Sequence, residues 1–503
     1  MSSLRARPLG QPIPESPHAV SCSLPTMAAV RGYEEKDPAV TSRMAAGYPR
    51  FFVNPLVRAL EAHLAIRPGM SGRKLWLTSS ARMARELVEH LARRGLAAEP
   101  FEDDGVHGVA HPSDPTIAAL AKVYLQNVGG FLSSREAEDI LVWRGLRIGA
   151  HPETDFPGGA ASAAAEIQRR LLPLLPGAQP EDLALAPSGM NAVHVAFRAI
   201  ADLQKTRGRT GWVQLGWLYM DTIEILRKCA PPGEYRYFSN VFDLSALEHL
   251  FAESGSRIAG LVTEIPTNPL VETPDVAALA GLCRRHGVAL ILDPTLASVF
   301  SVDVLRHADV LVTSLTKYTA SDGDVIAGLA VVNRGRADAD ELRRRITEGM
   351  EPVYPRDLAR LAAQIGETST VLARIQASAP AVARFLASHP KVREVHWALQ
   401  PNSADAYRQI ARHPAATGGV ISFAIHGPLQ PFYDRLLLAK GPSFGMKTTL
   451  ICPFMYLAHY DLVASDAGRA ELAASRLDPD LLRLCVGIEP VDEILAALDE
   501  ALR

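Results

Sequence analysis

The chain of 503 residues contains few cysteines, and their spacing fits neither a metal site nor a disulfide framework. No C-x-x-C pair and no cysteine-histidine cluster of metal-ligand spacing is present. Cys283 lies in an apolar helical pattern and Cys485 in an apolar strand pattern, which predicts buried thiols in a reducing compartment. The other cysteines are Cys22, Cys229 and Cys452. We therefore expect no metal site.

The sequence also lacks a strong charge of either sign and a long apolar run. A formal net charge of -3 gives no basic surface for nucleic acid, and no apolar stretch is long enough to cross a bilayer. The first eight residues hold two arginines but lead into no apolar segment, so we expect no secretory signal. These absences predict a soluble, cytoplasmic metabolic protein that binds neither nucleic acid nor membrane.

The length exceeds what one hydrophobic core usually covers, so two or more domains are expected. Residues 1–56 are rich in proline and serine and predict an extended arm that docks on another surface. Residues 57–112 predict a small additional α/β layer. Residues 113–370 alternate strand and helix signals, which predicts an α/β domain with a mostly parallel sheet, and residues 371–503 predict a smaller α+β domain.

Two mostly apolar runs in the large domain are followed by residues with reactive side chains. The run 288–292 meets its first charge at Asp293, and the run 308–313 ends shortly before Lys317. Such runs are typical of strands in a parallel sheet, where ligands gather at the carboxyl ends. Pyridoxal 5′-phosphate (PLP) needs a lysine amine for its aldehyde and a carboxylate that keeps its pyridine nitrogen protonated. The pair predicts a PLP enzyme; taken singly, the residues could be a helix cap and a solvated lysine.

A phosphate site is expected where the sequence Ser188-Gly189-Met190 follows a strand pattern and opens a helix. Small residues, a hydroxyl and free backbone N–H groups at a helix start suit a phosphate, although the same residues also form ordinary N-caps. Ser314 and Thr316 add hydroxyls beside the lysine.

Two smaller predictions concern helices. The helix after the strand pattern 258–263 is predicted to have Thr273 as N-cap and Pro274 as first residue, and to end at Gly287. The helix histidines His194 and His286 are predicted to be solvated or locally hydrogen-bonded, without a catalytic role.

Together, these motifs resemble the Cys/Met-metabolism PLP enzymes, the cystathionine gamma-synthase family of fold type I, from about residue 180 onward. Glu264-Ile-Pro-Thr-Asn268-Pro269 is similar to the family's E-x-P-[ST]-N-P, which implies that Asn268 bonds the cofactor's ring oxygen. Asp293-Pro294-Thr295 resembles D-N-T, with Thr295 against the ring. Ser314-Leu-Thr316-Lys317-Tyr318 resembles S-x-T-K-Y, and Ser188-Gly189-Met190 resembles the S-G-M phosphate turn.

Two later segments resemble the family's substrate motifs. Ser443-Phe444-Gly445 and Thr449-Leu450 are similar to S-L-G-G-x-E-S-L, which places Ser443 and Thr449 at the substrate. Arg483 occupies the arginine of L-x-R-x-S-V-G-x-E, which implies a bidentate pair with the substrate carboxylate, a geometry suited to a planar guanidinium. The alternative is a surface arginine on a strand.

The chain departs from the family in two places. Tyr219-Met220-Asp221-Thr222 replaces Y-G-G-T, without its two glycines; Tyr219 is still implied as the ring-stacking and acid/base residue. The arm Y-x-R-x-G-N-P appears as residues 48–55, one residue longer. In the family its tyrosine and arginine reach a neighbouring subunit's phosphate, so Tyr48 and Arg50 are expected to bind the cofactor across a homodimer or homotetramer.

Further segments, such as 14–20, 32–35 and 442–445, resemble the long fungal-type members of the family. That implies γ-replacement, in which an O-acylhomoserine and cysteine give cystathionine in methionine and cysteine metabolism. O-acylhomoserine sulfhydrylase and methionine or cystathionine γ-lyase activities share the same residues. An aminotransferase, or a protein that binds PLP without turnover, is a further alternative. The acyl group, the thiol donor, dimer or tetramer, and the role of the layer near residues 66–110 stay open.

Overall fold

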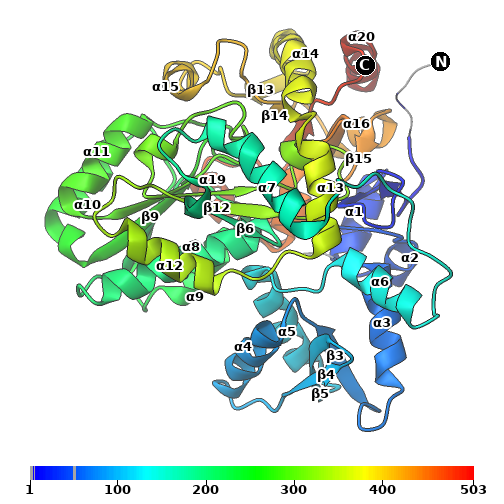
Figure 1. Ribbon diagram of the computed structural model, residues 1–503. Helices are drawn as coiled ribbons and strands as arrows, with labels where there is room; N and C mark the ends of the chain where they lie inside the picture. The colour runs from blue at the N-terminus through cyan, green and yellow to red at the C-terminus, as the bar shows by residue number, and fades with distance from the viewer. Residues whose placement is uncertain (1–3, 5, 49–51) are drawn as a thin grey trace.

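The computed structural model describes residues 4, 6–48 and 52–503 (Figure 1). Its large sheet has seven strands in the order β6-β12-β11-β10-β9-β7-β8. The strands from β11 to β8 are parallel, and β12 is antiparallel to both of its neighbours. The predicted mostly parallel sheet is confirmed. The strand bounds are β6 Leu183–Ala186, β7 Gly211–Leu215, β8 Tyr235–Phe238, β9 Ile258–Glu264, β10 Ala289–Asp293, β11 Val310–Ser314 and β12 Gly328–Val332.

Helices cover both faces of this sheet (Figure 1). Because side chains alternate along a strand, Val213 and Leu290 join one buried cluster while Trp212 and Ile291 join another. The helices are α7 Gly159–Leu171, α8 Gly189–Lys205, α9 Met220–Cys229, α10 Leu244–Ser254, α11 Val276–His286, α12 Ala339–Gly349 and α13 Pro355–Ile365. Short 3-10 turns are Leu172–Leu174, Pro180–Asp182, Gly255–Arg257, Leu305–His307 and Tyr318–Ala320.

The predicted start of α11 is wrong. Its N-cap is Asp275, whose carboxylate accepts from the Ala278 N–H at 2.8 Å. Thr273 is buried, and its N–H donates to the Ser403 hydroxyl at 3.0 Å, so this residue is held by the small domain. The predicted end at Gly287 is confirmed by its left-handed φ of 65°.

The smaller sheet has the order β13-β14-β17-β16-β15. Its strands are β13 Val392–His396, β14 Val420–Ile425, β15 Ala439–Lys440, β16 Leu450–Pro453 and β17 Leu482–Cys485. The accompanying helices are α14 Thr368–Ser388, α15 Ala404–Ile410, α16 Leu429–Arg435, α17 Phe454–Ala458, α18 Tyr460–Val463, α19 Asp466–Ala474 and α20 Val491–Leu502.

The N-terminal segment packs against this smaller sheet. It contains β1 Pro12–Ile13, β2 Ser21–Cys22, α1 Met27–Glu34 and α2 Pro38–Thr41, so it is less extended than predicted. Val30 and Tyr33 share a buried cluster with Phe423 and Leu482. The segment is therefore part of a hydrophobic core, in which its apolar side chains are removed from water.

An antiparallel three-stranded sheet, β3-β5-β4, forms a separate layer (Figure 1). Its elements and adjoining helices are α3 Pro55–Ala65, β3 Arg73–Leu77, α4 Ala81–Ala92, β4 Glu99–Asp103, β5 Val106–Pro112, α5 Pro115–Val128 and α6 Ser134–Trp143. Leu125 of α5 packs with Trp76 and Leu87 of this layer. The division of the chain at residues 56, 112 and 370 stays a prediction. Within the described part of the chain, no helix has the length and apolar character of a membrane span.

Candidate active site

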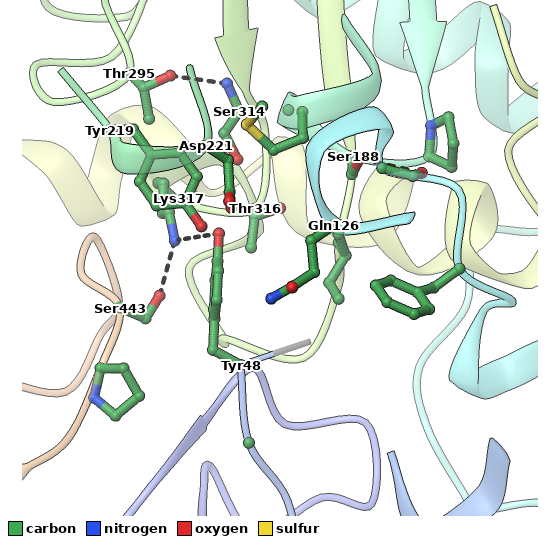
Figure 2. A pocket seen from close by; sticks show the side chains of 18 of the residues that line it. Tyr48, Gln126, Ser188, Tyr219, Asp221, Thr295, Ser314, Thr316, Lys317 and Ser443 are labelled. Atoms are coloured by element: carbon green, nitrogen blue, oxygen red, sulfur yellow. Dashed lines mark hydrogen bonds between the residues drawn. The ribbon is translucent and has the colours of Figure 1, made fainter. Parts of the chain in front are cut away.

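Lys317 follows β11 and projects into a cavity between the large sheet, the smaller domain and the N-terminal segment (Figure 2). Its Nζ donates to the Ser443 hydroxyl at 3.0 Å and to the Tyr48 hydroxyl at 3.4 Å. The aromatic rings of Tyr48 and Phe444 lie 4.5 Å and 5.0 Å from the same nitrogen. The amine is thus held at one point of the cavity by two hydroxyls and two rings.

Burial, and secondarily the charge of Arg483, lowers the pKa of Lys317 to about 7. An ordinary lysine has a pKa near ~10.4 and is almost wholly protonated at neutral pH. Lys317 therefore presents a sizeable fraction of neutral amine, the form that attacks an aldehyde and accepts a proton.

Asp293 ends β10, next to Lys317's own strand. Its Oδ1 accepts from the N–H of Thr295 at 2.9 Å and from the hydroxyl of Thr295 at 2.5 Å. That hydroxyl also accepts from the N–H of Ser314 at 2.8 Å, which joins the ends of β10 and β11. Burial raises the pKa of Asp293 to about 6, against the two Thr295 hydrogen bonds. A protonated ring nitrogen beside it would supply the missing positive partner.

The predicted phosphate turn lies at the start of α8, and Gly189 touches Ser314 there. A Cβ on Gly189 would stand 2.8 Å from the Cβ of Ser314, so only glycine allows this approach. Ser188 is the N-cap, its hydroxyl accepting from the N–H of Asn191 at 3.1 Å. Ser188, Gly189, Met190, Ser314 and Thr316 all line the cavity. The Thr316 hydroxyl is already hydrogen-bonded to the backbone of Ala327: it accepts from the Ala327 N–H at 3.1 Å and donates to the Ala327 carbonyl at 3.2 Å.

Arg483 reaches the cavity from β17 of the smaller sheet. Its guanidinium donates to Asn268 Oδ1 and to the Ser443 carbonyl, each at 3.1 Å. The rings of Phe444 and Phe454 lie 4.9 Å and 4.7 Å from its Cζ. Asn268, whose Oδ1 is thereby occupied, keeps its amide NH₂ as a donor toward a ring oxygen. An arginine fixed in a cavity and flanked by aromatic rings suits a carboxylate.

Tyr219 caps the N-terminus of α9 and lines the cavity (Figure 2). Its backbone N–H donates to Glu264 Oε1 at 2.5 Å, which ties the loop lacking the two glycines to the end of β9. The ring lies on the same side of the cavity as Lys317, where stacking on a cofactor ring is possible (Figure 2).

Two expectations meet a different geometry. Thr449 does not line the cavity: its hydroxyl donates to Glu489 Oε2 at 2.7 Å, so it orders the loop behind the site. Tyr48 contacts Lys317 within this chain, and its expected role at a neighbouring subunit's site stays a prediction; Arg50 lies outside the described residues. His194 is not solvated or hydrogen-bonded, because both its ring nitrogens are buried without a hydrogen-bond partner.

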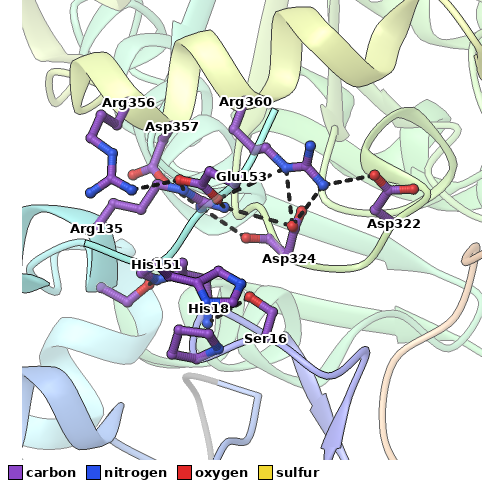
Figure 3. Close-up of polar contacts among 12 residues, drawn as sticks. Ser16, His18, Arg135, His151, Glu153, Asp322, Asp324, Arg356, Asp357 and Arg360 are labelled. Atoms are coloured by element: carbon purple, nitrogen blue, oxygen red, sulfur yellow. Dashed lines mark hydrogen bonds and ion pairs between the residues drawn. The ribbon is translucent and has the colours of Figure 1, made fainter. Parts of the chain in front are cut away.

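Several cavity residues were missed from the sequence, because only the fold brings them near Lys317. They include His18, Gln126, Ser134, Arg135 and Glu136. Arg135 anchors one wall through ion pairs with Glu153 at 2.7 Å and Asp357 at 2.9 Å (Figure 3). Two further lining residues stood in recognised motifs without a role being assigned: Asp221, where the family has glycine, and Glu264, the first residue of the E-x-P segment. Among the described residues, no cluster of histidine, cysteine, aspartate or glutamate could hold a metal ion.

The family model for Cys/Met metabolism PLP-dependent enzymes matches residues 165–503. The chain belongs to this family. Its cofactor is PLP, and the residues present fit that group: an amine at Lys317, a carboxylate at Asp293 and a tight helix start at Gly189. When bound, PLP supplies an electron sink that stabilises negative charge at the substrate's carbons.

Curated relatives cover nearly the whole chain. The L-2-amino-4-chloropent-4-enoate dechlorinase/desaturase of Streptantibioticus cattleyicolor is 39% identical over 98% of this chain and 97% of that protein. The cystathionine gamma-synthase of Neurospora crassa is 29% identical over 98% of each chain. The family and these relatives support PLP-dependent γ-elimination or γ-replacement chemistry.

A solved structure has the same fold. The cystathionine gamma synthase of Xanthomonas oryzae pv. oryzae in complex with cystathionine matches with a TM-score of 0.58 and 22% identity, over 71% of this chain and 92% of that chain. The PLP-dependent type I fold with its large and small sheet domains is thereby confirmed.

Proposed function

We propose that this enzyme removes a compact leaving group from Cγ of an L-amino acid, as the first half of a γ-replacement or as a γ-elimination. Arg483 would hold the α-carboxylate, and the Lys317 amine would take and return the protons at Cα and Cβ. Asp293 would keep the cofactor ring protonated, Tyr219 would stack on that ring, and Asn268 would bond its oxygen. The single observation that carries the proposal is the Lys317 amine in one cavity with Arg483 and Asp293.

The charges of the cavity favour an uncharged substituent at Cγ. Among the described lining residues, the cationic side chains are Lys317, Arg483 and Arg135. Arg135 is neutralised by its ion pairs with Glu153 and Asp357. Lys317 is assigned to the cofactor and Arg483 to the α-carboxylate. A succinyl or phosphoryl group would bring a further anion into this site without a matching cation, which is costly when desolvated. An acetyl ester or a chloro substituent carries no charge and needs no cation in the site.

The product depends on whether a thiol intercepts the substrate after the leaving group departs. The first candidate is cystathionine formation from an O-acylhomoserine and cysteine, supported by the full-length similarity to the Neurospora crassa enzyme. The second candidate is elimination from a 4-chloro amino acid without any thiol, supported by the 39% identity with the dechlorinase. Acylhomoserine sulfhydrylation and γ-lyase activity are the remaining outcomes.

We further propose that the enzyme works in the cytoplasm as a homo-oligomer. All five cysteines are free thiols, a state that a reducing compartment preserves. The type I fold is shared with known members of the family, which supports a dimer or tetramer as the working assembly.

Product analysis by mass spectrometry tests the proposal. Purified enzyme and its Lys317→Ala variant are given O-acetylhomoserine, O-succinylhomoserine or L-2-amino-4-chloropent-4-enoate, each with cysteine, with sulfide or without thiol. We expect turnover of the acetyl ester or the chloro substrate and none by the variant. Turnover of the succinyl ester alone would contradict the charge argument, and no turnover of any of the three would reject the proposed function.

A further inference from the structure

The three-stranded layer β3-β5-β4, whose role the sequence leaves open, reaches the active-site cavity through its helix α5. Gln126, in the last turn of this helix, lines the cavity, and Figure 2 shows its side chain pointing inward. The helix ends at Val128, and Gly129 follows as its C-cap with a left-handed φ of 67°. Gly129 lines the cavity as well. The end of α5 is therefore part of the cavity wall.

Asn127, next along α5, contacts the loop in which the family has two glycines. Its side-chain amide donates to Asp221 Oδ1 at 3.2 Å, and both residues are buried. Asp221 lies in the first turn of α9, two residues after Tyr219 (Figure 2). A glycine at this position would offer no side chain to accept the bond. The departure from the family motif is thus matched by a contact with the three-stranded layer.

The start of α9 is tied down on two sides. On one side, the Tyr219 N–H donates to Glu264 at the end of β9. On the other side, Asp221 accepts from Asn127 of α5. The Tyr219 carbonyl accepts from the Thr222 N–H at 2.9 Å, so the tyrosine is built into the first turn of the helix. A displacement of this turn would carry the tyrosine ring with it.

The same end of α5 packs against the predicted phosphate turn. The amide of Asn191 donates to the Val128 carbonyl at 2.9 Å and accepts from the Glu351 N–H at 3.1 Å. A Cβ on Gly129 would stand 2.1 Å from the Ser188 hydroxyl oxygen, so only glycine allows this approach. The start of α8 and the end of α5 are therefore fixed to each other.

The layer itself is anchored at the same place. At the start of α4, the Arg82 guanidinium donates to Glu351 Oε1 at 2.8 Å, and the Ser79 hydroxyl donates to Glu351 Oε2 at 2.6 Å. Glu351 is buried, and Arg82 also donates to the Met350 carbonyl at 2.6 Å. Helices α4 and α5 share one buried apolar cluster, so anchoring α4 also anchors α5.

We propose that the three-stranded layer is part of the cofactor site, and that Asn127 is a positioning residue that sets the place of Tyr219 through Asp221. A buried carboxylate needs hydrogen-bond donors, and its charge is favoured at the start of a helix. The Asn127 amide supplies a donor from a rigid neighbour, and this fixes where the first turn of α9 lies. The inference rests on the proposed stacking of Tyr219 on the cofactor ring.

Exchanging the two side chains tests the contact. Asn127→Asp places a carboxylate against Asp221, whereas Asp221→Asn keeps an oxygen that accepts from Asn127. The double variant restores the hydrogen bond with donor and acceptor exchanged. Each apo-protein is titrated with PLP, and the Kd is obtained from the absorbance. We expect the Kd to rise at least ~10-fold in Asn127→Asp and to stay within ~3-fold of wild type in Asp221→Asn and in the double variant.

A spectroscopic readout separates positioning of the tyrosine from a general loss of stability. The visible circular dichroism of bound PLP reports the surroundings of its ring, and Tyr219→Ala provides the reference for a ring without its stacking partner. Asn127→Asp should shift the signal in the same direction as Tyr219→Ala, and the double variant should return it toward wild type. A raised Kd with an unchanged signal would overturn the proposed link to Tyr219.

Asn333→Asp is the matched control. Its amide donates to the Ala308 carbonyl at 2.8 Å, and Asn333 does not line the cavity formed by the described residues. This variant should lower the denaturant midpoint and leave the Kd for PLP unchanged. If Asn127→Asp yields no folded protein, Asp221→Ala tests the same bond from its other end, with an expected rise of the Kd of ~10-fold.

Two outcomes would reject the proposal: wild-type affinity for PLP in Asn127→Asp or Asp221→Ala, or a double variant that binds PLP no better than Asn127→Asp. These measurements use no substrate. An enzyme that turned over none of the tested amino acids would reject the proposed function and leave the cofactor titrations unaffected.

Discussion

Asp293 and Glu264 lie side by side as register partners at the carboxyl ends of the parallel strands β10 and β9. Burial, and secondarily the charge of Asp293, raises the pKa of Glu264 well above its ordinary value. Two such carboxyls do not both ionise in one buried site, so Asp293 carries the charge and Glu264 keeps its proton. The pair thereby reserves a single negative charge for the cofactor's ring nitrogen.

Replacing Glu264 by glutamine should therefore be mild. The amide mimics the protonated acid and still accepts from the Tyr219 N–H, so kcat/KM is expected to stay within ~3-fold of wild type. Asp293→Asn, which removes the charge itself, should lower kcat at least ~100-fold. Steady-state kinetics of both variants checks this. A loss in Glu264→Gln as large as that in Asp293→Asn would mean that Glu264 is ionised.

Cofactor attachment should report the titration of Lys317. Because its pKa is lowered to about 7, the fraction of neutral amine rises as the pH passes that value and levels off above it. Apo-enzyme mixed with PLP is therefore expected to form the Lys317 link with a rate midpoint near pH 7, followed by absorbance. Arg483→Met removes a charge that lowers this pKa and should shift the midpoint upward. A midpoint above pH 9 in wild type would contradict the burial of the amine.

Arg483→Lys should weaken substrate binding. A point-like ammonium cannot reproduce the planar two-donor contact with a carboxylate, so we expect KM to rise ~10–100-fold, about 1.4–2.7 kcal/mol. Arg435→Lys is the matched control, because its guanidinium donates to the Ala501 carbonyl and does not line the cavity formed by the described residues. Equal KM values for the two variants would remove Arg483 from substrate binding.

Arg135→Ala should destabilise the fold. Its side chain is 1% exposed and pairs with Glu153 and Asp357 (Figure 3). Glu153 keeps Arg356 at 2.7 Å, but the loss of Arg135 leaves the buried Asp357 carboxylate without its cation. Removing one partner of such a buried pair costs about 3–5 kcal/mol, measured as a lower denaturant midpoint. Arg344→Ala, whose pairs with Glu341 and Glu348 are on the surface, should leave the midpoint unchanged.

Glu136→Gln should stabilise the protein at alkaline pH. Burial, then the carboxylates of Asp357 and Asp139, raises the pKa of Glu136 to about 7. A carboxyl whose folded pKa is raised does not destabilise the native state below its unfolded pKa near ~4.3; the destabilisation grows between that pH and 7 and is fully present above 7. The variant should therefore match wild type at pH 4 and exceed it by about 1–2 kcal/mol at pH 8.5. A gain that is equal at both pH values would rule out titration of this group.

Much of the site could be predicted because its signals are local. The apolar runs before Asp293 and Lys317 predict strands; Asp293 is the last residue of β10, and Lys317 is the third residue after β11. The turn at Ser188 opens α8 as expected. Thr449 shows the limit of a motif: Ser443, Phe444 and Cys452 on either side of it line the cavity, whereas the Thr449 hydroxyl bonds Glu489.

Short motifs identify the family and the cofactor and point to Lys317, Asp293 and Arg483, because each is recognised from the few residues around it. The contact of Tyr48 with Lys317 and the place of Glu136 in the same cavity come from the packing of the folded chain. The reason is physical: these contacts join segments more than a hundred residues apart. They depend on how buried apolar faces pack, and a local pattern does not encode that geometry.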